Sequence, residues 1–395
     1  MNSGLSISNV KGAVETVESH LHPVPSYDLA DHPVPTGREE VWRFTPLKRL
    51  GGLLDGAPSD GHLKWDAHVP EGVTVSEIST EDAAVLGETL PADRPSALAV
   101  ALGGGAVLVD VPAETELREP LVIRLSGAAA DDQVWGHIVV RLGTHAKATV
   151  VFEHTGSARY GASTSVLVGE NAQLDVISLQ LWDDDAVHLG QIGVRIGRDA
   201  HVRSFQATLG GNLVRIIENF AYDGPGGELE AFGLYFVDAG QHIEHRLFID
   251  HNAPHTKSNA VYKGGLQGEG AHSVWVGDVL IRQAAEGIET FETNRNLVLT
   301  DGCRADSVPN LEIETGEIVG AGHASATGRF DDEQLFYIQS RGVTEDEARR
   351  LVVHGFFADI IKKIKVPEIE ARLLAAVESE LAQTVGANPS SAVLA

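Results

Sequence analysis

The sequence predicts a mainly β protein whose centre is a β-solenoid, in which successive coils of chain stack on one another. A Gly-x-x-Ala motif recurs at Gly143, Gly169 and Gly197, with a degenerate copy at Gly224, and strand-like residues flank each copy. The copies lie 26, 28 and 27 residues apart, and a period of about 20–50 residues is typical of stacked repeats. Because almost no helical pattern lies between the copies, each repeat is predicted to be a coil of strands.

The corner motif itself has a physical interpretation. Glycine fits a tight turn that needs a positive φ, and the small alanine packs at the corner. Two later copies, at Gly268 and Gly302, keep the motif but lose the period. A flat β-sandwich is the alternative architecture, although its strands need not share a recurring corner motif.

Residues 1–100 predict an N-terminal lead-in followed by a small, partly helical domain. The segment HPVPSYDLADHPVP sets four prolines among polar residues, which is typical of an extended chain. The segment EEVWRFTPLKRLGGLL then has Trp42, Phe44, Leu47 and Leu50 at mixed short spacings. We assign residues 101–328 to the β-helix core, where β-branched runs are broken by Gly and Pro.

Residues 329–395 predict a C-terminal helical domain. The segment DDEQLFYIQSRG predicts a short helix capped by Asp331 or Asp332, with Gly342 just past its end. Thr344–Glu347 forms a capping-box pattern at the start of the next helix. Three- and four-residue steps between apolar positions predict one buried helical face, comprising Ala348, Leu351, Val352, Phe356, Ile360 and Ile364.

Pro367 separates this helix from a further one. The segment EIEARLLAAVESELAQ predicts a second amphipathic helix, and the last ten residues, GANPSSAVLA, predict a frayed tail. The pattern therefore changes from strands to helices soon after His323.

Composition narrows the class of protein. The chain has 395 residues, a formal net charge of −26 and one cysteine. This charge and the absence of Lys/Arg clusters argue against nucleic acid as a partner. No apolar run approaches the ~18 residues that span a membrane, and the N-terminus lacks a signal-peptide pattern. A single cysteine excludes an internal disulfide, so we expect a cytoplasmic protein.

Cys303 and His323 are the first candidate ligands. Both side chains can bind soft or borderline metals such as iron or zinc. Two ligands are too few for a closed site, which needs about four, so the others would come from another chain, water or substrate. A buried structural cysteine and a plain structural histidine are the alternative interpretations.

A second group lies in GQHIEHRLFIDHNAPHTKS, which holds His242, Glu244, His245, His251 and His255. On a strand, His242 and Glu244 would share one face and His245 would point the other way. His251 and His255 have the spacing of helical metal ligands, but the proline between them argues against a helix. Both a metal site and ordinary loop or surface histidines fit this pattern.

Several enzyme motifs are absent from the sequence. It contains no GxxxxGK[ST] phosphate loop, no GxSxG nucleophile elbow and no HExxH. We therefore do not expect this chain to hydrolyse ATP.

The C-terminal block resembles a known family. The segment DSVPNLEI, the Gly/Ala-flanked His323 and DDEQLFYIQSRGVTEDEARRLVVHGFF resemble the C-terminal half of the SufB/SufD iron–sulfur cluster assembly proteins. The VWRFTPL segment around Trp42 resembles the short N-terminal motif of the SufD branch, and both ADSVPNLEI and the length favour that branch. The resemblance is detailed over residues 302–364 and looser back to about residue 101.

The resemblance implies a right-handed parallel β-helix with a small N-terminal domain and a C-terminal α-helical domain. It implies a cytoplasmic SufBCD-type complex, in which this chain is a non-catalytic scaffold and the SufC-type ABC ATPase hydrolyses ATP. A transient iron–sulfur cluster would form between this chain and a SufB-type paralogue. The resemblance also connects the complex with reduced flavin and leaves open a homodimer of the isolated chain.

The resemblance also carries roles to particular residues. His323 matches the histidine to which the SufD branch assigns a part in cluster formation. Cys303 stands where the SufB branch carries its functional cysteine, and Ala321 stands where some relatives carry another. The implied ATPase-docking residues are Phe336, Tyr337, Arg341, Gly342, Leu351, Phe356, Phe357 and Ile360.

Three alternatives remain open from the sequence. The chain could belong to the SufB branch, as Cys303 suggests. It could be a β-solenoid enzyme acting on polysaccharide, although no secretion signal is present. It could also be a mononuclear metal enzyme that uses His242, Glu244 and His251.

Overall fold

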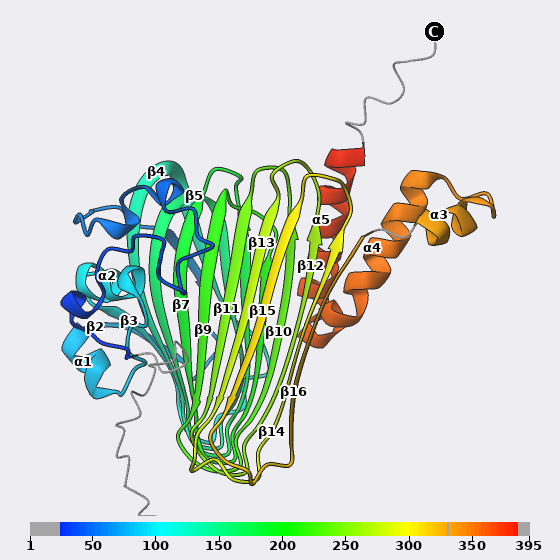
Figure 1. The fold of residues 1–395 in the computed structure, drawn as a ribbon. Helices are drawn as coiled ribbons and strands as arrows, with labels where there is room; N and C mark the ends of the chain where they lie inside the picture. Colours follow the sequence, from blue (N-terminus) through cyan, green and yellow to red (C-terminus); the bar gives the residue numbers. More distant parts are fainter. Residues whose placement is uncertain (1–23, 330–331, 386–395) are drawn as a thin grey trace, which may run out of the picture.

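The computed structural model describes residues 24–329 and 332–385. Its centre is a 16-stranded sheet wound into a solenoid with two broad faces (Figure 1). The odd-numbered face consists of β7 (Val187–Ile196), β9 (Leu213–Tyr222), β11 (His242–His251), β13 (His272–Ile281) and β15 (Arg304–Ile313). The even-numbered face consists of β6 (Gln173–Trp182), β8 (His201–Thr208), β10 (Glu228–Val237), β12 (Lys257–Leu266), β14 (Glu289–Val298) and β16 (Gly320–Arg329).

The two faces meet in β5 (Lys147–Val168). Its first half pairs with β6 and its second half pairs with β7, in both cases in parallel. From there each later strand pairs in parallel with the strand one coil earlier on its own face. The predicted parallel β-helix is therefore confirmed, and the β-sandwich alternative is wrong, because from β6 onward consecutive strands lie on opposite faces rather than pairing as hairpins.

The corner glycines have a different role from the one predicted. Positive φ falls on the residue two positions after Gly143, Gly169 and Gly197. A Cβ at Gly197 would lie only 2.6 Å from the carbonyl oxygen of Val168 in the preceding coil. These glycines are thus required by close approach between coils. The positive-φ residues are His145, Asn171 and Asp199, and the alanines that follow them are buried as predicted.

The two later glycines, by contrast, fit the predicted role. Gly268 has φ 83° and Gly302 has φ 81°. They lie in the turns that lead into β13 and β15, at the opposite edge of the solenoid from the corners after Gly169 and Gly197. The motif therefore marks both edges, which explains why its period breaks between Gly224 and Gly268.

The N-terminal segment covers the outer surface of the odd-numbered face. Trp42, Leu50 and Leu53 are buried against Leu189 and Leu213 of β7 and β9. The segment is mixed and partly helical, as predicted; the placing of the domain boundary at residue 100 stays a prediction. Its elements are η1 (Leu29–Asp31), η2 (Leu47–Arg49), η3 (Gly51–Leu54), β1 (Lys64–His68), β2 (Thr74–Ile78), α1 (Thr80–Val85) and α2 (Arg94–Leu102), followed by β3 (Ala106–Val111) and β4 (Leu121–Leu142).

The C-terminal helices cover the even-numbered face (Figure 1). They are α3 (Asp332–Gln339), α4 (Glu345–Ile361), η4 (Lys362–Ile364) and α5 (Pro367–Val385). Val353 and Phe357 of α4 share one apolar cluster with Phe232 and Phe236 of β10. By contrast, α3 extends away from the strands at the far end of α4 (Figure 1).

The predicted helix ends are largely correct. Thr344 caps α4 by accepting a hydrogen bond from the backbone NH of Glu347, and Gly342 has φ 90° in the turn before it. Asp332 lies inside α3 rather than at its cap, and Asp331 and the predicted tail lie outside the described residues. The predicted buried face is wrong at Leu351, which is 57% exposed.

Candidate functional site

The solenoid has an open end at its last coil. β15 and β16 are the terminal strands of the sheet order, so each has one edge without a partner strand in the described chain. Most of β15 is only half-buried, and β16 is exposed from His323 onward. Large apolar side chains are exposed beside these strands, namely Phe291, Ile313 and Val319. Such an uncovered strand edge with apolar neighbours is typical of a surface that another chain covers.

His323 lies at this open end. It is the last of a column of register partners, to which each coil contributes one residue. Its register partner on β14 is Glu292, whose own partner on β12 is Ala260. Partners in a parallel ladder point to the same face, and Ala260 belongs to the interior core. His323 therefore faces inward, but its side chain stays 43% exposed because no further coil covers it. The five earlier members of this column are Val150, Val176, Ser204, Ala231 and Ala260.

Glu292 is a buried acid whose carboxylate accepts no hydrogen bond from the described residues. Its side chain is 2% exposed, and neither oxygen has a hydrogen-bond partner in the described part of the chain. Nδ1 of His323 lies 3.8 Å from Oε1 of Glu292, beyond hydrogen-bonding distance. Burial, and then the charge of Asp278, raise the pKa of Glu292 to about 8.

Cys303 lies at the other edge of the last coil. It occupies the turn before β15, where its thiol donates to the carbonyl oxygen of Gly268 at 3.3 Å. Burial raises the pKa of this thiol above its ordinary value, so the protonated form is favoured at neutral pH. Cys303 also packs partly against the interior core, which agrees with the structural interpretation.

The structure does not bring Cys303 and His323 together. His323 and Arg329 both lie on β16, and Arg329 is in register with Val298 at the edge where the turn to Cys303 begins. Six residues of strand correspond to about 20 Å. The two residues therefore cannot bind the same ion within one chain, and a role for either remains a prediction.

The proposed ATPase-docking residues fall into two groups. Phe336, Tyr337 and Leu351 are exposed apolar side chains on α3 and α4, at 72%, 58% and 57%. Arg341 and Gly342 are exposed between these helices. Phe357 and Ile360 are instead buried in this chain's own core, and a contact of these two side chains with a partner stays a prediction. Phe356 is half-buried, and its carbonyl oxygen accepts a hydrogen bond from Lys263 at 2.7 Å.

The histidine-rich segment forms β11. His242 and Glu244 share the outer side of this strand, whereas His245 faces the interior and bonds with Thr208 at 3.0 Å, as the strand alternation predicts. The expectation of loop or surface histidines is wrong for His242, His245 and His251, which are all buried; only His255 is exposed. Burial lowers the pKa of His245 to about 4 and that of His251 to about 3.

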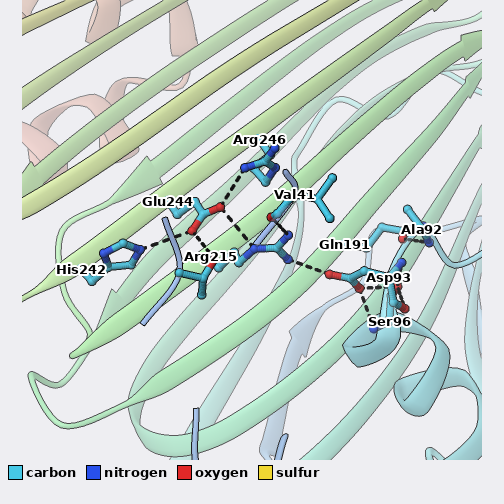
Figure 2. Close-up of polar contacts among 10 residues, drawn as sticks. Val41, Ala92, Asp93, Ser96, Gln191, Arg215, His242, Glu244 and Arg246 are labelled. Carbon is cyan, nitrogen blue, oxygen red and sulfur yellow. Dashed lines mark hydrogen bonds and ion pairs between the residues drawn. The ribbon is translucent and has the colours of Figure 1, made fainter. Parts of the chain in front are cut away.

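Glu244 is the centre of a buried polar network (Figure 2). Arg246 donates to it at 3.1 Å and Arg215 at 3.3 Å, while His242 lies 3.3 Å away. Thr45 of the N-terminal segment also donates to Glu244, at 2.7 Å. Burial alone would raise the pKa of Glu244, but His242 and the two arginines outweigh it and hold this pKa well below its usual range.

Arg215 joins this network to the VWRFTPL segment. It donates to the carbonyl oxygen of Val41 at 3.2 Å and to Asp93, the N-cap of α2, at 2.6 Å (Figure 2). Its guanidinium also lies over the ring of Trp42, 4.0 Å from the centroid. The segment therefore fastens the N-terminal region to β9 and β11. Sequence reasoning found the segment but not this role, because its partners lie about 170–200 positions away.

The described residues contain neither a complete metal site nor a membrane span. No group of three or more His, Cys, Asp or Glu side chains within residues 24–329 and 332–385 could hold a metal ion. The hypothesis of a mononuclear site at His242, Glu244 and His251 is therefore wrong, since arginines surround Glu244 and His251 bonds to Thr256 and Ser258. No helix in these ranges is long and apolar enough to cross a membrane.

Comparison with known proteins decides the family. The sequence matches the family model described as SUF system FeS cluster assembly, SufBD core domain, over residues 124–356. The chain belongs to the SufBD family. It is 50% identical over 363 residues to the iron-sulfur cluster assembly SufBD family protein of Mycobacterium tuberculosis (strain ATCC 25618 / H37Rv), covering 90% of this chain and 91% of that protein.

Two further SufBD relatives match the chain over most of its length. The corresponding protein of Mycobacterium leprae is 48% identical over 373 residues, covering 93% of this chain and 95% of the relative. The iron-sulfur cluster assembly protein SufD of Escherichia coli (strain K12) is 24% identical over 380 residues, covering 88% and 89%. The expected family resemblance is thus confirmed, and the polysaccharide-enzyme alternative has no support from these relatives.

Glu292 is the residue of this site that sequence reasoning missed. It lies 31 positions before His323, whereas the recognisable repeats are 26 to 28 positions apart. The coils lengthen toward the C-terminus, so the period could not align the two residues. Its one sequence signal is the polar alternation Glu292, Asn294, Asn296 on β14, which places polar side chains inside the solenoid.

Proposed function

We propose that this SufBD protein is a SufD-branch scaffold subunit of a SufBCD-type complex that assembles iron–sulfur clusters. One observation carries the proposal: His323, the residue matching the SufD histidine, lies part-exposed on the uncovered last coil. Two SufD proteins also lie among its relatives. The SufB branch is the second candidate, favoured only by the presence of Cys303.

The site is incomplete in this chain, which fits a role shared with a second chain. The described residues offer no set of three ligands, and a closed site needs about four. A SufB-type paralogue that covers the open end would supply the missing donors, and the nascent cluster would be held transiently between the two chains. In this role the protein is cytoplasmic and non-catalytic, and the isolated chain could use the same end to form a homodimer.

The surface formed by α3 and the start of α4 is the proposed docking site for a SufC-type ATPase. Phe336, Tyr337 and Leu351 expose apolar area there, although another face of α4 is buried against the β-helix. Exposed apolar residues on a projecting helix are suited to insertion into a groove of a partner.

The first test is cluster assembly by the reconstituted three-protein complex carrying His323→Ala. We expect a large loss of cluster formation, followed by absorbance under anaerobic conditions, because the substitution removes a donor. His255→Ala is the matched control, since His255 is an exposed corner histidine two coils before the last one. Unchanged cluster formation by His323→Ala would exclude the ligand role.

The second test is capture of the ATPase by the Leu351→Asp variant. A charge at this exposed position should weaken capture without unfolding the chain, because the side chain makes few internal contacts. Val85→Asp, at an 86% exposed apolar position on α1, is the control for added surface charge. Equal capture by both variants would argue against docking through α4. Phe356 is a poorer choice, because Lys263 bonds to its backbone and contacts its ring.

A further inference from the structure

The pair formed by Glu292 and His323 has an unusual arrangement for two buried or half-buried ionisable groups. They are register partners on β14 and β16, so both point toward the solenoid interior. Yet Nδ1 of His323 and Oε1 of Glu292 are 3.8 Å apart, and both carboxylate oxygens lack hydrogen-bond partners among the described residues. A buried polar group without a partner is costly, and each such group in a native fold calls for an explanation.

The surroundings make room for this carboxylate instead of satisfying it. In the five earlier coils, the residues aligned with Glu292 are apolar or small. The nearest of them is its register partner on β12, Ala260. Across the interior, a Cβ at Gly277 would overlap with Oε2 of Glu292. The Trp275 ring borders the same place. The absence of a side chain at Gly277 thus leaves space for the Glu292 carboxylate. Glu292 is the residue of the column that lies directly beside His323.

We propose that Glu292 and His323 together form the first binding site for ferrous iron on this chain. An imidazole nitrogen and a carboxylate oxygen bound to one ion at about 2.1 Å each lie about 3–4 Å apart, and the observed separation is 3.8 Å. Imidazole and carboxylate both suit Fe(II). The iron is cargo, delivered to the place where the cluster forms, and water or a partner chain completes its coordination.

This inference rests on the proposed function, because it names how that site receives iron. It also explains why one ligand is buried and the other exposed. Glu292 is 2% exposed and His323 is 43% exposed, so an ion arriving from solvent would meet the imidazole first. The ion would supply the partner that the Glu292 carboxylate otherwise lacks. No change of strand register is needed to bring the imidazole and the carboxylate together.

The test is anaerobic titration of the full-length chain with Fe(II), followed by calorimetry, with Co(II) absorbance as a second probe. We expect one ion per chain, with affinity reduced at least tenfold in both Glu292→Gln and His323→Ala. His68→Ala is the matched control, because His68 and Glu119 form an exposed histidine–carboxylate pair with 3.1 Å between their atoms. It should bind Fe(II) like the wild type.

The outcomes separate this inference from the proposed function. If folded Glu292→Gln binds Fe(II) as the wild type does, the inference is wrong, even where His323→Ala abolishes cluster assembly in the complex. If both substitutions abolish Fe(II) binding, the inference stands, even where the complex with His323→Ala still assembles clusters. Circular dichroism establishes folding of each variant, and Glu292→Asp, which keeps the carboxylate, should recover part of the affinity.

Discussion

Two buried glutamates of the β-helix have opposite surroundings. Glu244, on β11, is fully buried and receives hydrogen bonds from Arg215 and Arg246 (Figure 2). Thr45 also donates to it. Glu292, on β14, is equally inaccessible but has no hydrogen-bond partner in the described chain. Burial alone therefore does not distinguish a structural acid from a functional one. The difference lies in whether the fold supplies the partners or leaves them to be supplied from outside.

The position along the solenoid explains this difference. Glu244 lies in the middle coils, where the N-terminal segment covers the odd-numbered face and brings Trp42 and Thr45 to the network. Glu292 lies one strand from the open end, where only His323 follows it. A repeat fold can satisfy polar groups between its coils, but its last coil keeps groups that only another molecule can satisfy.

The largest expected effect is at Arg215, the residue that joins the network around Glu244. Arg215→Met should destabilise the chain by about 3–5 kcal/mol, because it leaves Glu244 and Asp93 short of a buried partner and removes the stacking on Trp42. The measurement is urea unfolding of the isolated chain, followed by circular dichroism.

Arg198→Met is the control for loss of an arginine ion pair. Arg198 pairs with Glu170 at 2.8 Å on the surface, with both side chains about half exposed. Exposed pairs contribute little, so the urea midpoint should stay near that of the wild type. A similar loss of stability in Arg215→Met and Arg198→Met would mean that the buried network stabilises the fold no more than an exposed ion pair does.

Removing the charge of Glu292 should raise the stability of the chain, whereas removing that of Arg215 lowers it. Glu292→Gln should stabilise the metal-free chain by about 2–4 kcal/mol at pH 7.5, because the wild-type carboxylate is ionised in the unfolded chain and must take up a proton on folding, whereas glutamine needs none. Glu244→Gln is the matched substitution and should destabilise, because it leaves Arg215 and Arg246 facing a neutral group. A loss of stability in both variants would show that Glu292 has structural partners in solution.

Stability against pH extends this contrast. The pKa of Glu292 is raised from 4.5 to about 8, so its ionisation disfavours the folded state increasingly from pH 4.5 to 8. The advantage of Glu292→Gln over the wild type should grow across that window, by about 1 kcal/mol per pH unit. Glu244 has a lowered pKa, so its contribution is present above pH 4.5 and is lost as the pH falls.

The measurement is the urea midpoint of the wild type and the two glutamine variants from pH 4 to pH 9, with a chelator present. The difference between wild type and Glu244→Gln should shrink toward the acid end, and that for Glu292→Gln should shrink there too but with opposite sign. A difference at Glu292 that does not change with pH would contradict its raised pKa.

The sequence predicted the repeat architecture better than the long-range contacts made by the N-terminal segment and by the last coil. Corner motifs at Gly143, Gly169 and Gly197 report local geometry, so they predicted the coils even though the reason for the glycines differed. Helix caps such as Thr344 are equally local. The pairing of Thr45 with Glu244 spans 199 positions, and no period in the sequence connects them.

His323 was predictable for a similar reason, and Glu292 was not. His323 could be found because it stands alone among small residues and resembles a family motif. Glu292 gains its meaning only from register with His323 and from the space left by Gly277. Register in the last coils depends on loop lengths that vary, so three-dimensional pairing was needed to identify this residue.

The smallest expected effect, at Thr45, tests how the N-terminal segment is fastened. Thr45→Val keeps the shape of the side chain but removes the donor 2.7 Å from Glu244, and three other groups still surround that carboxylate. We therefore expect a loss of only about 1 kcal/mol, together with faster hydrogen exchange in the segment around Trp42. Thr45→Ser retains the hydroxyl and should exchange like the wild type. If Thr45→Val destabilised the chain as much as Arg215→Met, the network would depend on its outermost donor, and the tight fastening of Glu244 would come from the N-terminal segment rather than from the neighbouring strands.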